Sequence, residues 1–202
     1  MATIYDLKPS FQALLRPIAG RFVRGGVTAN AVTLAALALS LVQGASIALL
    51  PEARWPLLLL PLTLFVRMAL NAIDGLMAKE HGQKTVRGAV LNELSDVISD
   101  AVLYLPLALI AGVSAPLVVL VVVSSVIAEF AGVLGPAIGA SRRYDGPFGK
   151  SDRAFAFGST AALLGLGLAP GSWTAVVLAG MLALSAITIW NRARKAMAET
   201  KT

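Results

Sequence analysis

The chain has 202 residues, of which 57% are hydrophobic and 14% are charged, and its mean hydropathy is +0.77. A water-soluble domain carries about a quarter charged residues, so the composition excludes an ordinary soluble enzyme. There is no cysteine, which excludes disulfides, thiolate metal sites and cysteine nucleophiles. For the net charge of +6 we expect anionic membrane lipids, and not nucleic acid, as the partner; alternatively, the topology alone accounts for it.

The N-terminal segment, residues 1–30, is predicted to form an amphipathic helix at the membrane interface. Its apolar residues recur at helical spacing, with arginines between them: Phe11, Leu14, Leu15, Ile18 and Phe22. The segment lacks the early apolar core of a cleavable signal peptide.

Long uncharged runs predict membrane helices, because a bilayer core about 30 Å thick is crossed by about 20 helical residues. Six spans are predicted, separated by glycine and proline: Ala31–Leu50, Trp55–Ala78, Gly88–Ala111, Ala115–Ile138, Asp152–Leu168 and Ser172–Trp190. We therefore expect an all-α integral membrane protein, with one six-helix transmembrane domain over residues 31–192 and a cytoplasmic tail over residues 193–202.

The basic residues predict the orientation. Fifteen of the 17 lysines and arginines fall before the first span, after the second and fourth spans, or around the C-terminus. By the positive-inside rule, both termini and the loop after the second span are cytoplasmic. We expect a bacterial inner or cell membrane.

Residues 71–100 concentrate acidic side chains between apolar segments. The acids are Asp74, Glu80, Glu93, Asp96 and Asp100. A carboxylate at the centre of a lipid-exposed membrane helix costs about 2.5–3.5 kcal/mol. These acids must therefore face a polar cavity, bind a cation, or form a solvated ladder at the interface.

The helical spacing of these residues favours a cation site. Polar residues fall on one face of each of two predicted helices, namely Arg67, Asn71 and Asp74 in the second span and Asn92, Asp96 and Asp100 in the third. Because a short loop joins the two spans, the faces can meet at the same depth. The resulting carboxylate and amide oxygens are ligands suited to Mg²⁺, Mn²⁺ or Ca²⁺.

The same residues resemble the signature of the CDP-alcohol phosphotransferases, D-x-x-D-G-x-x-A-R, eight residues, then G-x-x-x-D-x-x-x-D. The residues of this chain at the signature positions are Asn71, Asp74, Gly75, Ala78, Lys79, Gly88, Asn92 and Asp96. The spacing is reproduced without a gap over 26 positions. Upstream, Thr28-Ala29-Asn30 followed by Thr33 is similar to the family's T-P-N-x-x-T.

The resemblance implies a six-helix membrane transferase of phospholipid biosynthesis, expected as a homodimer. Such enzymes transfer a substituted phosphate from a CDP-linked donor, often CDP-diacylglycerol, to an alcohol acceptor, and release CMP with Mg²⁺ or Mn²⁺. Asp74 would then be a metal ligand and Asp96 the base that deprotonates the acceptor, in addition to binding metal. The CDP cradle would consist of Gly75, Ala78, Lys79 and Gly88, with Asn30 and Thr33 nearby.

This sequence departs from the signature at three positions. Asn71 and Asn92 replace two aspartates, which removes two negative charges, although an amide oxygen can still bind a hard cation. Lys79 replaces an arginine and retains its charge without the planar guanidinium.

Two further acids are candidate metal ligands in place of the missing aspartates. Glu93 and Asp100 both lie within a helical turn of Asp96. Alternatively, Asp100 is the buried partner of a basic residue such as Arg67.

Other polar residues suggest where the acceptor binds. Glu129 lies in an otherwise uncharged span, so it is expected to line the acceptor or nucleotide cavity, or else to have a structural hydrogen-bonding role. Four cations near the fifth span are candidates to bind a phosphate on the acceptor: Arg142, Arg143, Lys150 and Arg153. We prefer the pair Lys150 and Arg153, although all four could simply satisfy the positive-inside rule.

Two other functions remain open. One is a family member that binds nucleotide or lipid without turnover, which the two asparagines allow. The other is a small membrane transporter, which the clustering of the acids near one loop and the lack of an inverted repeat disfavour. The acceptor alcohol is not identified by the sequence.

Overall fold

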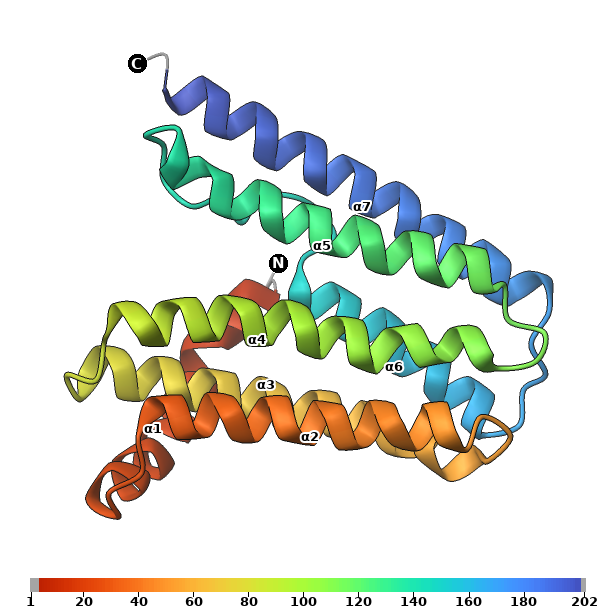
Figure 1. The fold of residues 1–202 in the computed structure, drawn as a ribbon, viewed down its shortest axis with the longest axis horizontal. Helices are drawn as coiled ribbons and strands as arrows, with labels where there is room; N and C mark the ends of the chain where they lie inside the picture. Colours follow the sequence, from red (N-terminus) through yellow and green to blue (C-terminus); the bar gives the residue numbers. More distant parts are fainter. Residues whose placement is uncertain (1–3, 201–202) are drawn as a thin grey trace. The chain divides into compact units, whose positions relative to one another are not determined.

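The computed structural model describes residues 4–200, which contain helices and no β-strand (Figure 1). The elements in chain order are α1 (Ile4–Arg24), α2 (Ala29–Leu49), α3 (Arg54–Glu80), α4 (Val86–Tyr104), the 3₁₀-helix η1 (Leu105–Leu109), α5 (Ala115–Ala137), α6 (Lys150–Gly165) and α7 (Ser172–Glu199). An α-helix is found at each of the six predicted spans. α7 continues past Trp190, through most of the segment expected as a tail.

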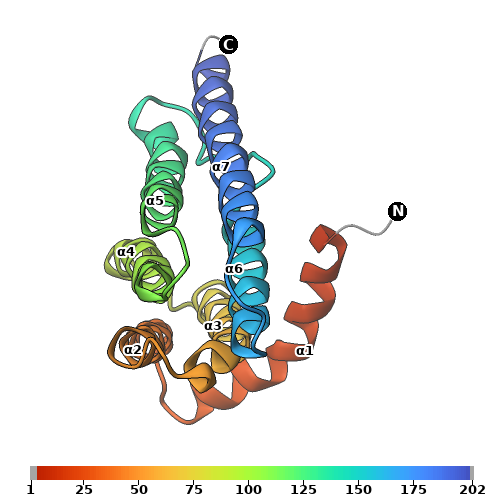
Figure 2. The same cartoon turned by 90° about the vertical axis from the view of Figure 1, so that its right-hand side faces the viewer.

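The described chain divides into two compact units. The first comprises residues 4–42 and 62–99, which are α1, the first part of α2, the second part of α3 and most of α4. The second comprises residues 43–61 and 100–200 and includes α5, α6 and α7. Within this second unit, α5 and α7 lie side by side in both views (Figure 1, Figure 2).

Four of the described helices are long and apolar enough to cross a membrane, namely α2, α3, α5 and α7. α6 has 16 residues and is about 24 Å long, shorter than a bilayer core. α4 has 19 residues but carries Arg87 and three acids. The all-α membrane class is therefore confirmed, and the count of six spans stays a prediction.

The third predicted span, Gly88–Ala111, is not one continuous α-helix in the structure. α4 ends at Tyr104, and η1 with Pro106 follows. Proline has no N–H and cannot bond the carbonyl four residues earlier, which belongs to Val102. Gly44 of α2 allows that carbonyl to come close, since a Cβ at residue 44 would overlap the Val102 oxygen.

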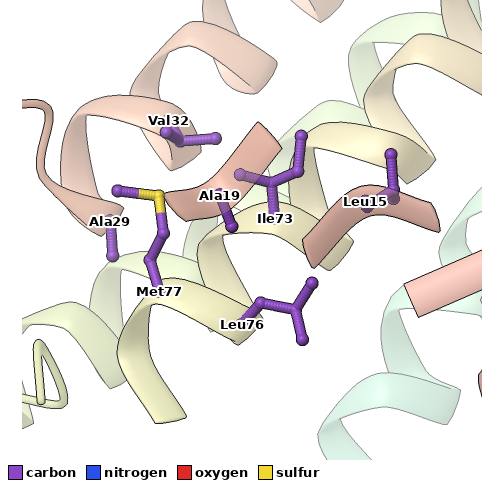
Figure 3. Close-up of a cluster of buried hydrophobic side chains, with 7 residues drawn as sticks. All are labelled: Leu15, Ala19, Ala29, Val32, Ile73, Leu76 and Met77. Carbon is purple, nitrogen blue, oxygen red and sulfur yellow. The ribbon is translucent and has the colours of Figure 1, made fainter. Parts of the chain in front are cut away.

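The first unit has an apolar core to which three of its helices contribute. Side chains from α1, α2 and α3 converge there: Leu15, Ala19, Ala29, Val32, Ile73, Leu76 and Met77 (Figure 3). α1 is therefore packed against the bundle through Leu15, while Leu14 on its other face is 71% exposed. Arg16 of α1 also donates hydrogen bonds to both carboxylate oxygens of Glu80, at 2.8 and 3.1 Å from its Nε. The lipid contact expected of this amphipathic helix stays a prediction.

Candidate functional site

Asp74 lies in the first unit and is almost fully buried. Its side chain is 3% exposed, and its Oδ2 accepts a hydrogen bond from the Thr33 hydroxyl at 2.7 Å. The sequence interpretation assigned Thr33 to the nucleotide, whereas the structure places it against the carboxylate. A charge-assisted hydrogen bond of this length holds Asp74 in one orientation.

Asp96 is held by two residues of α3. The Asn71 amide donates to Asp96 Oδ1 at 2.9 Å. Arg67 Nη2 donates to the Asp96 carbonyl oxygen at 3.0 Å and lies 3.5 Å from Oδ1. In the structure, Asn71 therefore donates a hydrogen bond to Asp96, the predicted base. Its predicted role as a metal ligand stays a prediction. We call these five residues (Thr33, Arg67, Asn71, Asp74 and Asp96) the Asp96 cluster.

The structure thus joins the first and fourth acidic positions of the signature, Asn71 and Asp96, by a hydrogen bond, and Asp74 follows Asn71 by one helical turn on α3. Arg67, which is 3% exposed, contacts Asp96. Asn92 and Glu93 are both half-buried on α4. Their predicted roles as ligands stay predictions.

The candidate nucleotide residues differ in their surroundings. A Cβ added at Gly75 would meet no atom within 4 Å among the described residues, so this glycine does not serve close helix packing there. A Cβ at Gly88 would come within 2.7 Å of Asn30 Oδ1 and 2.9 Å of Thr85 Oγ1. Lys79 is exposed and Ala78 is half-buried.

The turn before α4 contains contacts that sequence reasoning missed. The Thr85 hydroxyl accepts a hydrogen bond from the Gly88 N–H at 2.9 Å, as an N-cap does. The Gln83 side-chain oxygen accepts from the Ala29 N–H at 2.6 Å at the start of α2. Thr85 precedes the first residue of a predicted span by a few positions, and a threonine there predicts an N-cap. The contact between Gln83 and Ala29 could not be predicted from local sequence, because 54 residues separate the two.

The oxygen ligands of the Asp96 cluster fit a cation that is shared with a substrate. Residues 4–200 contain no group of three or more Asp, Glu, His or Cys side chains that could hold a metal by themselves. Magnesium commonly uses one or two carboxylates together with the phosphates of its substrate. Asp74 and Asp96 supply that number of carboxylates, and the amide oxygen of Asn71 is a further hard donor.

A second polar cluster lies in the second unit, around Arg153 of α6. This guanidinium is 1% exposed. Its Nε and Nη2 donate to Asp100 Oδ2 at 3.0 and 2.9 Å, and Nη2 also donates to Glu129 Oε1 at 2.8 Å. Asp100 is therefore the buried partner of a basic residue, as the alternative interpretation of this acid predicted, and that residue is Arg153.

Glu129 connects α5 to further arginines. Its Oε2 lies 3.3 Å from Arg192 Nη1 and 3.7 Å from Arg142 Nη2. We call these five residues (Asp100, Glu129, Arg142, Arg153 and Arg192) the Arg153 cluster. Arg192 was not singled out from the sequence, where it reads only as one of several basic residues near the C-terminus.

The loop between α5 and α6 is held by the end of α7. Arg143 Nε donates to Asp145 Oδ2 at 2.9 Å, and Lys195 Nζ donates to Asp145 Oδ1 at 2.6 Å. The hydrogen bond from Lys195, and then that from Arg143, lower the pKa of the Asp145 carboxyl below its usual range. Glu199 accepts from the Ser141 N–H at 2.9 Å and from Arg143. The structure thus pairs Arg143 with acids of this chain, and it places the half-buried Lys150 at the start of α6.

Solved structures share the fold of this chain. No protein-family model matches the chain. Mycobacterium tuberculosis phosphatidylinositol phosphate synthase (PgsA1), crystallised with CDP-DAG bound, has a TM-score of 0.73 and 20% identity, over 94% of each chain. PgsA1 in complex with manganese and citrate has a TM-score of 0.75 and 24% identity, over 91% of this chain and 88% of that one. The chain is an all-α membrane protein with the fold of this synthase.

One relative in sequence is an inner membrane protein. The chain is 52% identical over 158 residues to the inner membrane protein YnbA of Escherichia coli (strain K12), which is 77% of each protein. The chain therefore belongs to the family of inner membrane protein YnbA.

Proposed function

We propose that the protein is a CDP-alcohol phosphotransferase that moves a phosphatidyl group from CDP-diacylglycerol to an alcohol and releases CMP. The observation that carries this proposal is the Asp96 cluster, in which Asp74 and Asp96 are held in fixed orientations at the signature spacing. The fold of a synthase crystallised with CDP-DAG supports it. We further propose a homodimer whose active site faces the cytoplasm.

The two carboxylates have different roles because their exposure differs. The Asp96 side chain is 27% exposed, whereas Asp74 is 3% exposed. A general base must come within hydrogen-bond reach of the proton that it accepts. Asp96 is therefore the base, and the buried Asp74 would be a ligand of a divalent cation that would neutralise charge on the diphosphate of the donor.

The reaction is a substitution at phosphorus. The acceptor oxygen forms a bond to the phosphorus that carries diacylglycerol, and the bond from that phosphorus to the bridging oxygen breaks. CMP leaves with the bridging oxygen, and the hydroxyl proton passes to Asp96. A bound Mg²⁺ or Mn²⁺ neutralises charge on the diphosphate. In this chain its ligands would be Asp74, Asp96 and Asn71, with Asn92 and Glu93 on the same segment of α4.

CMP release by the purified full chain tests the proposal. The protein is incubated with CDP-diacylglycerol, Mg²⁺ or Mn²⁺ and a pool of alcohols, and CMP is measured by chromatography. Asp96→Asn keeps an oxygen that can accept from Asn71 but removes the base, so the rate should fall by about 10²–10⁴-fold. Glu80→Gln is the matched control, because it removes an acid whose ion pair with Arg16 is solvent-exposed and contributes little.

Two results would contradict parts of the proposal. One is CMP release that Asp96→Asn does not change, which would contradict the role of Asp96 as the base. The other is no CMP with any acceptor while CDP-diacylglycerol still binds the protein. The second result favours a binding protein without turnover, an alternative that Asn71 and Asn92 support.

A further inference from the structure

The two buried arginines of the Arg153 cluster, Arg153 and Arg192, are already paired with acidic and carbonyl groups of the chain. Two of the nitrogen atoms of Arg153, Nε and Nη2, donate to the carboxylates of Asp100 and Glu129. Arg192 donates to the Ala128 carbonyl oxygen at 2.6 Å and lies 3.3 Å from Glu129. These arginines therefore do not form an uncompensated basic site.

Glu129 is the residue on which this neutralisation depends. It contacts three arginines, at 2.8 Å (Arg153), 3.3 Å (Arg192) and 3.7 Å (Arg142). Its side chain is 16% exposed and that of Arg142 is 27% exposed, so the cluster is reached from outside the core. A ligand that approaches the arginines there also approaches the carboxylate of Glu129.

The charge of the cluster does not suit a phosphate monoester. Such a group carries about −1.5 to −2 charges at pH 7. Three guanidinium groups against two carboxylates leave about one positive charge. A phosphate would also lie close to carboxylates that repel it.

One atom of the cluster lacks a partner and fits a neutral oxygen. Arg153 Nη1 is buried and has no hydrogen-bond partner among the residues that the structure describes. A buried donor without an acceptor destabilises the protein, so an acceptor atom is expected beside Arg153 Nη1. Because Asp100 and Glu129 already balance the charge of Arg153, that acceptor needs no charge of its own. A hydroxyl oxygen satisfies the donor.

We propose, as an extension of the transferase function above, that the Arg153 cluster selects an acceptor alcohol that carries no phosphate. Arg153 Nη1 donates a hydrogen bond to a hydroxyl oxygen of this acceptor. Glu129 is the specificity-determining residue, since it occupies the guanidinium groups that a phosphorylated acceptor would need.

Pairs of acceptors that differ only in a phosphate test this selectivity. The full-length protein is assayed for CMP release with glycerol against glycerol 3-phosphate, and with inositol against inositol 1-phosphate; serine is included as an acceptor without phosphate. The unphosphorylated alcohol should react with a kcat/KM higher by about tenfold or more within its pair. Preference for the phosphorylated member of the pair that reacts overturns the inference, whereas turnover of serine alone supports it.

The variant Glu129→Gln tests the role of the carboxylate. The ratio of kcat/KM for phosphorylated over unphosphorylated acceptor should rise by about tenfold or more, mainly through a lower KM for the phosphate ester. Glu52→Gln, which removes an exposed acid between α2 and α3, should leave the ratio unchanged. A loss of general stability does not invert acceptor preference, so an unchanged ratio in folded Glu129→Gln contradicts the assignment. If that variant does not fold, Asp100→Asn is used in the same comparison.

Binding of inorganic phosphate separates failure of this inference from failure of the transferase function. If no acceptor gives CMP, the thermal stability of each protein is measured with increasing phosphate against matched chloride. Stabilisation of Glu129→Gln and not of the unchanged protein supports the selectivity even without turnover. Equal stabilisation of both, or of neither, overturns it.

Discussion

At the scale of single residues, the two signature glycines lie in different surroundings. Gly75 has open space where a Cβ would be, and Gly88 lies against Asn30 and Thr85. An identical substitution at the two positions should therefore have opposite effects on stability. The comparison separates a glycine that leaves room for a ligand from one that fits against its neighbours.

We predict that Gly75→Ala weakens the use of the CDP-linked donor without unfolding the protein. Alanine at an open helical position stabilises by about 0.5–1 kcal/mol, so the melting temperature in detergent should stay or rise. The KM for the donor should rise, because the added methyl group takes space beside Asp74. The measurements are thermal unfolding and donor-dependent CMP release.

Gly88→Ala is the matched comparison. Its methyl group would displace the Thr85 hydroxyl that caps α4, which costs about 1 kcal/mol. Its melting temperature should therefore fall. If Gly75→Ala lowers the melting temperature as much and leaves the KM unchanged, Gly75 has a packing role and no ligand lies against it.

At the scale of elements, apolar length and the positions of glycine and proline predicted where helices occur. α2, α5 and α7 begin within two residues of the predicted spans. The early end of α4 also follows from Pro106, which lies within an apolar run and has no N–H to continue the α-helix.

The contacts between side chains of different helices are harder to predict from the sequence than the helices themselves. Asp100 accepts hydrogen bonds from Arg153, which lies 53 residues away and which the sequence did not single out as its partner. Spacing along one helix fixes which residues share a face, as for Asn71 and Asp74. It does not fix which helix that face meets, and several buried arginines were available.

The close approach of α2 to α4 gives a prediction at this scale. A Cβ at Gly44 would overlap a backbone carbonyl, that of Val102, which cannot move as a flexible side chain can. Gly44→Ala should therefore reduce the free energy of unfolding by about 1–3 kcal/mol. Thermal unfolding in detergent measures this loss.

Gly180 of α7 supplies the control for that measurement. It is exposed, and a Cβ there would meet no atom within 4 Å among the described residues. Gly180→Ala should leave the melting temperature unchanged or slightly raised. Equal melting temperatures for the Gly44 and Gly180 variants would mean that α2 and α4 do not approach closely at Gly44.

At the scale of the whole molecule, the number of membrane crossings depends on α4 and α6. Neither meets the criteria of length and apolar composition that the other four helices meet. However, Asp100 of α4 and Arg153 of α6 form a buried ion pair at 2.9 Å. Charges that are paired inside a bundle are tolerated at membrane depth, so the two helices can cross together where one alone would not. We therefore predict six crossings.

Single cysteines distinguish six crossings from four, because the sequence has no cysteine of its own. Ala111→Cys and Tyr144→Cys are introduced separately at exposed positions and labelled in intact cells with a thiol reagent that does not cross the membrane. With six crossings and a cytoplasmic N-terminus, Ala111→Cys is outside and labelled, whereas Tyr144→Cys is inside and protected. With only α2, α3, α5 and α7 crossing, the two results are exchanged.

Three further positions fix the reference sides for this experiment. Glu52→Cys and Ala169→Cys lie outside under both topologies, and Lys84→Cys lies inside under both. Arg142 and Arg143 next to Tyr144 favour the cytoplasmic side for that loop, in agreement with six crossings. Labelling of Tyr144→Cys with protection of Ala111→Cys would mean that α4 and α6 do not cross. In that case the ion pair between Arg153 and Asp100 would lie outside the bilayer core, and it would not serve to neutralise charge within the membrane.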